Sequence, residues 1–125
     1  MDRIQFSNGE AEIRVSALFK KEHGSVIFFI PALNLADDGP TRDRAEAMAK
    51  EAIALQVEDL HPSGCDFLAH YDDLGWKKGE TSEQFVLSDF NDLPSYVKDI
   101  IKDGYLSCEH ELDEITVKLR RFHTS

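Results

Sequence analysis

The sequence predicts a single domain of the α+β class, in which a small antiparallel sheet packs against one long helix. Three observations carry this prediction. Residues 10–19 alternate between apolar and polar side chains, residues 26–30 are an apolar run, and residues 41–60 carry apolar side chains at helical spacing. The chain has 125 residues and is 42% hydrophobic, so it can bury a core without metal ions or disulfides.

The first predicted elements are a β-hairpin and a short third strand. A polar lead-in over 1–9 precedes the alternating segment, whose apolar side chains share one face: Ile13, Val15, Ala17 and Phe19. The turn signal at 23–25 joins this segment to the run 26–30, which is apolar on both faces as in a central strand. Residues 33–35 are a candidate third strand, and the sequence 37–40 is typical of the turn that closes it.

The clearest element is a helix that begins after Thr41, because a threonine hydroxyl can accept a hydrogen bond from a free N–H of the first turn. Its buried face consists mainly of small side chains at helical spacing: Ala45, Met48, Ala49, Ala52, Ile53 and Leu60. Pro62 and Gly64 end the helix. Within the domain 1–125, residues 10–60 are the best-supported core, and residues 65–125 are a C-terminal elaboration.

The C-terminal elaboration is predicted to add a helix and a strand to the fold. Residues 85–90 indicate a short strand or extended segment, and residues 93–102 indicate a helix that Gly104 ends. Apolar and polar residues alternate again over 114–122, which predicts a strand paired with residues 105–112.

The net charge of the chain indicates which classes of partner it can bind. The 24 acidic residues outnumber the 14 basic ones and give a net charge of −10. Such a surface repels phosphate backbones, so we expect no direct nucleic-acid binding and favour a basic protein partner, with solubility alone as the other explanation. We find no signal-peptide pattern and no apolar stretch near the roughly 20 residues of a membrane span, so we expect a cytoplasmic protein without membrane contact.

Two stretches carry a resemblance to a known family. The first runs from Ile30-Pro31-Ala32-Leu33-Asn34-Leu35 through Gly39-Pro40-Thr41 to the alanine-rich helix 45–53, and the second is Leu74-Gly75-Trp76-Lys77. Together they resemble the HicB family of antitoxins, in particular a branch without a DNA-binding tail. Asn34 and Leu35 stand where the family has a glycine and an aromatic residue. No ribbon-helix-helix or helix-turn-helix pattern follows, so we do not expect the operator binding that HicB antitoxins perform.

This resemblance implies a function as well as a fold. HicB proteins neutralise HicA toxins, which are small basic proteins that cleave RNA, and they assemble as dimers or higher oligomers. We therefore expect a non-catalytic, antitoxin-like module without cofactors that forms a homo-oligomer and sequesters a small basic partner on an acidic surface. The candidate contacts, chosen from charge and expected exposure, are Asp37, Asp38, Glu46 and Glu51. Trp76 is a fifth candidate, because tryptophan is enriched at binding hot spots, with core packing under a loop as the alternative.

Metal chemistry is a competing interpretation. Cys65 with His70, and Cys108 with His110, carry donor types that zinc prefers. Their Cys-x4-His and Cys-x-His spacings are not those of structural zinc modules, so we predict no metal site and no catalytic residue. Paired carboxylates such as Asp72-Asp73 keep open the alternative of a metal-assisted hydrolase or nuclease-like small enzyme. A structural homo-oligomer that pairs an edge strand at 10–19 between subunits is the other alternative.

Overall fold

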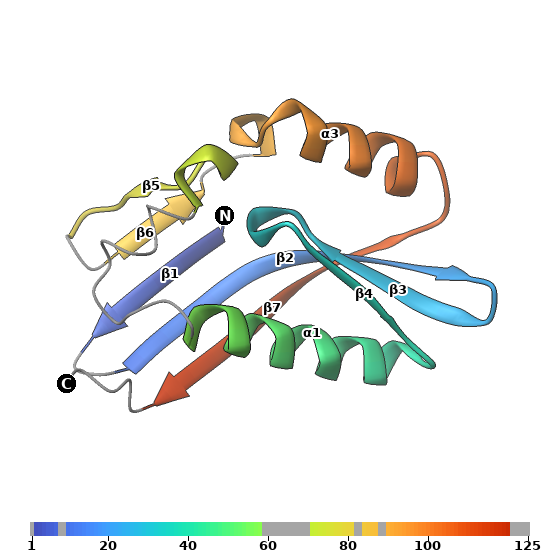
Figure 1. Cartoon of the computed structure of the whole chain (residues 1–125), viewed down its shortest axis with the longest axis horizontal. Helices are drawn as coiled ribbons and strands as arrows, with labels where there is room; N and C mark the ends of the chain where they lie inside the picture. Colours follow the sequence, from blue (N-terminus) through green and yellow to red (C-terminus); the bar gives the residue numbers. More distant parts are fainter. Residues whose placement is uncertain (1, 8–9, 59–70, 82–83, 88–89, 121–125) are drawn as a thin grey trace.

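The computed structural model describes residues 2–7, 10–58, 71–81, 84–87 and 90–120, and it has the predicted α+β architecture (Figure 1). Within this part of the chain, seven strands form one antiparallel sheet. The strands are β1 (Asp2–Ser7), β2 (Glu10–Glu22), β3 (Ser25–Ile30), β4 (Leu35–Gly39), β5 (Lys77–Lys78), β6 (Gln84–Leu87) and β7 (Glu111–Arg120). The helices are α1 (Arg42–Glu58) and α3 (Ser95–Ile101), and short helical turns are η1 (Pro31–Leu33), η2 (Asp72–Leu74), η3 (Phe90–Asp92) and η4 (Lys102–Leu106).

Strand β2 organises the sheet. One side of β2 pairs with β7 along 10–19, while its other side pairs with β1 over 10–14 and with β3 over 18–22. The sheet continues from β3 to β4 and from β1 to β6 and β5, which gives the order β4-β3-β2-β1-β6-β5 with β7 beside β2 (Figure 1). The segment 10–19 is therefore an interior strand, and the expectation that it is an edge strand available for pairing between subunits is wrong.

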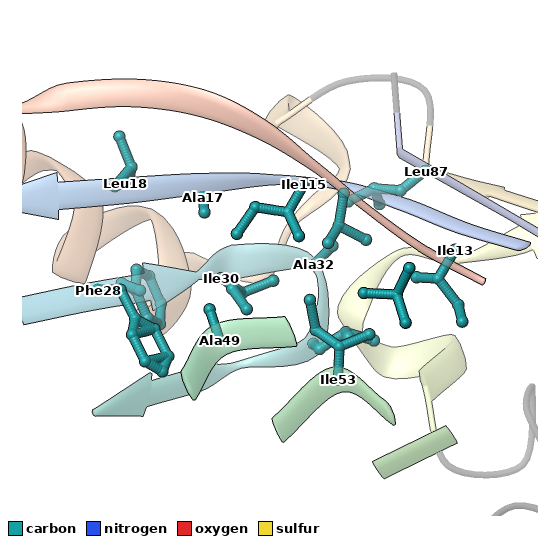
Figure 2. Packing of buried hydrophobic residues seen from close by; sticks show 14 of the residues in the cluster. Ile13, Ala17, Leu18, Phe28, Ile30, Ala32, Ala49, Ile53, Leu87 and Ile115 are labelled. Carbon is teal, nitrogen blue, oxygen red and sulfur yellow. The ribbon is translucent and has the colours of Figure 1, made fainter. Parts of the chain in front are cut away.

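The main core lies between the sheet and α1 (Figure 2). The sheet contributes β-branched side chains from alternate positions of β2 and β7, and α1 contributes a stripe at every fourth residue: Ile13, Val15, Ile115 and Val117 from the sheet, and Ala45, Ala49, Ile53 and Val57 from α1. The first turn of the helix approaches β4 closely where that strand has a glycine, since a Cβ added at Gly39 would lie only 2.8 Å from the backbone nitrogen of Ala45. The predicted alanine-rich helix is confirmed, with Thr41 Oγ1 accepting from the N–H of Arg44 at 3.1 Å.

On the opposite face of the sheet, η4 packs over β2 and β3. The ring of Tyr105 stacks on Phe29 with centroids 5.9 Å apart. Lys20 reaches the same place, since its Nζ donates to the carbonyl of Gly104 at 2.8 Å and lies 4.9 Å from the Tyr105 ring centroid. The prediction that Gly104 ends the helix is wrong, because a π-helical turn carries the chain on to Leu106. This turn places Tyr105 over the sheet.

Three further expectations are corrected by strand pairing. The polar lead-in over 1–9 contains strand β1, whose Ile4 and Phe6 are buried between β2 and β6. Asp37 and Asp38 do not form a turn but lie within β4, which begins after Asn34 takes a left-handed φ of 51°. Strand β7 pairs with β2 and not with the residues just before it. The predicted turn at 23–25 is confirmed, with positive φ at His23 and Gly24.

No helix in the described residues is long and apolar enough to cross a membrane.

Candidate partner-binding surface

The exposed candidates for partner contact lie on two neighbouring elements. Asp37 and Asp38 are exposed on β4, and Glu51 is exposed on α1, which packs against β4 (Figure 1). Among the described residues, none of these three carboxylates forms an ion pair with a cation of this chain. Their charge is therefore free to act on a partner.

Glu46 differs from the other candidates because its charge is already paired. The carboxylate lies 3.0 Å from Nη1 of Arg42 and 3.6 Å from Nζ of Lys50, and the residue is half-buried. A carboxylate held between two cations offers little attraction to a third. The structure thus favours Asp37, Asp38 and Glu51 over Glu46 as contacts.

A second group of carboxylates, which the sequence did not single out, lies at the start of β7 beside the first turn of α1. Nη2 of Arg42 is 3.0 Å from Glu111 and 2.9 Å from Asp113, and its guanidinium lies 3.5 Å above the ring of Phe19. Burial lowers the pKa of Arg42, but hydrogen bonds to Glu111 and Glu46 outweigh it and the pKa is raised. This ion-pair cluster joins α1 to β7, because Arg42 of α1 binds both Glu111 and Asp113 of β7.

The acidic surface is defined here as the exposed carboxylates of β4, α1, the start of β7 and the residue two positions before it: Asp37, Asp38, Asp43, Glu51, Glu109, Glu111 and Asp113. Successive side chains of a strand point to opposite faces, so Asp37 and Asp38 lie on either side of the outer edge that β4 forms. The cations interspersed with them are Arg42, Arg44 and Lys50. Acids outnumber bases in this region, and both terminal nitrogens of Arg42 are engaged by ion pairs. The run of acids over 109–114 is visible in the sequence, but its position beside α1 depends on the pairing of β7 with β2.

Trp76 is placed in the core. The residue is 2% exposed, and its indole Nε1–H donates to the carbonyl of Ala32 at 2.6 Å. Of the two interpretations of this tryptophan, core packing is the one that fits its position, because a partner cannot reach a buried ring. The hydrogen bond ties the segment around β5 to the turn that follows β3.

A pocket of about 350 Å³ borders the acidic surface between β2, α1 and the start of β7. Its lining mixes both signs of charge with apolar side chains: Phe19, Lys20, Lys21, Val26, Arg42, Glu109, His110 and Glu111. Lys20 and Arg42 are engaged by other groups of the chain. The mixed lining favours neither an anionic nor a cationic small molecule.

The candidate metal ligands are only partly described. Cys65 and His70 lie outside the described residues. Cys108 is exposed, with Sγ 3.3 Å from the carbonyl of Gly104, and Nδ1 of His110 lies 3.0 Å from the carbonyl of Cys108. Asp72 and Asp73 are exposed in η2. No group of three or more potential metal ligands occurs in the part of the chain that the structure describes.

Comparison with protein-family models, with curated proteins and with solved structures finds no match.

Proposed function

We propose that this chain is a non-catalytic protein-binding module that sequesters a small basic partner on its acidic surface. The observation that carries the proposal is that three of the candidate carboxylates, Asp37 and Asp38 on β4 and Glu51 on α1, are exposed and form no ion pair within the part of the chain that the structure describes. Charges of one sign on neighbouring elements raise the rate of encounter with a partner of opposite sign and orient it.

The proposed mechanism is competition with RNA. A protein that acts on RNA binds the phosphate backbone through lysine and arginine side chains. An acidic surface that covers those side chains blocks the same face sterically and electrostatically, as the resemblance to HicB antitoxins implies. The complex should weaken as salt screens the charges.

The test is a pull-down from the native host at low and at high salt, with the bound proteins identified by mass spectrometry. The test variant combines Asp37→Asn, Asp38→Asn and Glu51→Gln, which removes three charges and retains the side-chain carbonyl oxygens. The matched control combines Asp72→Asn, Asp73→Asn and Glu80→Gln, three exposed carboxylates on the part of the chain around η2 and β5. Both variants lose the same net charge, so only the position of the change differs.

We expect the wild type and the control to recover the same small basic protein at low salt and to lose it at high salt. The test variant should recover about tenfold less, because each surface pair contributes on the order of 0.5 kcal/mol and three are lost together. Equal recovery by the test variant would refute the assignment of the surface. Recovery of nothing but the chain itself would refute the partner and favour a homo-oligomer, which sedimentation would then measure.

A further inference from the structure

The sheet has three outer strands, β4, β5 and β7. In the part of the chain that the structure describes, each of them pairs on one side only: β4 with β3, β5 with β6, and β7 with β2. An outer strand presents backbone N–H and C=O groups that can pair with another chain, which makes it a site for strand addition. Strand addition by a partner or by a second copy requires that these backbone groups are free.

On β4, an outward backbone donor is occupied by the chain itself. The N–H of Asp38 donates to Oδ1 of Asp37 at 2.8 Å. Because an antiparallel strand with one neighbour turns the groups of every second residue away from that neighbour, this N–H is one that an added strand would need. A strand that joins β4 must first break the bond to Asp37.

Strand β7 carries the same arrangement at its beginning. The N–H of Glu114 donates to Oδ1 of Asp113, also at 2.8 Å. Oδ2 of Asp113 lies 2.9 Å from Nη2 of Arg42, and this ion pair holds the carboxylate in place. Two strands that are far apart in the sequence thus share one hydrogen-bonding feature, an aspartate that accepts the N–H of the residue after it.

The third outer strand is protected against strand addition in another way. Strand β5 consists of two residues, Lys77 and Lys78, and both are exposed. A short edge strand made of lysines offers few backbone groups and repels a second copy of itself.

We propose that Asp37 and Asp113 are edge guards, which hinder strand addition at β4 and β7 so that neither a second copy nor an extended partner segment joins the sheet. Resting on the proposed function, the inference adds that the basic partner is held by side-chain charge on the acidic surface and not by a backbone ladder. The acidic surface and the two outer strands share Asp37 and Asp113, so charge and hydrogen-bond acceptor must be removed separately.

The experiment compares two double variants of the full chain. Asp37→Ala with Asp113→Ala removes both acceptors and both charges, whereas Asp37→Asn with Asp113→Asn removes the charges and keeps a carbonyl acceptor for each N–H. Both variants lose the ion pair to Arg42, so they differ in the side-chain carboxamide, which is present only in the asparagine variant and can accept the N–H. Self-association is measured by sedimentation velocity and by thioflavin fluorescence over a range of concentrations, with circular dichroism to verify the fold.

We expect the alanine variant to self-associate at about tenfold lower concentration than the wild type, because each freed N–H gains an intermolecular partner. The asparagine variant should behave as the wild type does. Wild-type behaviour of the alanine variant, or equal association of both variants, would overturn the proposal. If the double alanine variant does not fold, the single Asp37→Ala variant, which leaves Arg42 untouched, decides by the same criterion.

The two proposals fail in different ways. Capture of a basic partner depends on charge and is weakened by substitution with either asparagine or alanine, whereas protection of the outer strands depends on the acceptor and is lost only on substitution by alanine. Strand addition by the wild type would end the edge proposal and leave the acidic surface to be judged by its own pull-down.

Discussion

Burial of Asp2 should make the stability of this protein fall as pH rises. Strand β1 pairs with β2 as far as Arg14, and β3 pairs with β2 from Leu18 onward, so Ser16 lies at the gap between the two partners. Oδ1 of Asp2 fills this gap, accepting the N–H of Ser16 at 2.9 Å and its hydroxyl at 3.0 Å. The residue is 3% exposed, and its buried Oδ2 has no hydrogen-bond partner among the described residues.

The size of this effect on the free energy of unfolding follows from the shift in the pKa of Asp2. Burial raises the pKa of Asp2 from 3.8 to about 6, although both hydrogen bonds from Ser16 lower it. One pH unit corresponds to about 1.4 kcal/mol, so the charged form costs the folded state about 3 kcal/mol at neutral pH. Between pH 3.8 and 6 the folded chain binds the proton more tightly than the unfolded chain does. The contribution of Asp2 to stability is therefore highest below this window, falls through it and is constant above it.

The assay is urea unfolding of the wild type and of Asp2→Asn at pH 4 and pH 7.5, with tags kept off the N-terminus. Trp76 is the one tryptophan of the chain and is buried, so its fluorescence reports unfolding. We expect the free energy of unfolding of Asp2→Asn, relative to the wild type, to rise by about 2.5 kcal/mol from pH 4 to pH 7.5, because a small part of the effect is already present at pH 4. Asp99→Asn, at an exposed position, is the control. A constant difference for Asp2→Asn, or an Asp2 pKa below 4 by NMR titration, would refute the reasoning.

Two further substitutions test local packing by urea unfolding. Gly75→Ala should destabilise by on the order of 3 kcal/mol, because φ is +102° and the added Cβ would lie 2.3 Å from the carbonyl oxygen of Asp92. Gly24→Ala, with positive φ but open space around it, should cost only about 1 kcal/mol, and equal costs would contradict the clash. Arg42→Lys should cost about 1 kcal/mol, since lysine loses the forked contacts to β7, whereas Arg44→Lys at an exposed position should cost nothing measurable.

Local sequence patterns predicted a structural feature correctly wherever the interactions that form it lie within a few residues. The hydroxyl of Thr41 caps α1 because the groups involved lie within four residues of each other. The turn at His23 and Gly24 joins β2 to β3 for the same reason, since the chain reverses over neighbouring residues. The alternation over 10–19 correctly indicated which face of β2 is buried.

Strand partners were not predictable in this way. Residues 114–120 form a strand as the alternation indicates, but nothing in that alternation distinguishes pairing with β2 from pairing with the residues just before it. The chain pairs β7 with β2 because this places Ile115 and Val117 under α1, in the main core. Strand β1 was missed for a related reason, since six residues with two apolar side chains become a strand only when neighbours on both sides pair with them.

For the candidate partner-binding surface as well, the sequence determined some properties and the tertiary structure determined others. Composition alone determined that the protein is acidic, and the spacing of apolar residues predicted an α+β domain. Residue type and expected exposure made Asp37, Asp38 and Glu51 candidates. Tertiary structure decided that Trp76 is buried and that Glu46 is held by two cations. It also decided that acids around residue 111 lie beside α1. Charge and periodicity are properties of single residues and short windows, whereas burial, ion pairing and strand partners depend on which distant segments the hydrophobic core brings together.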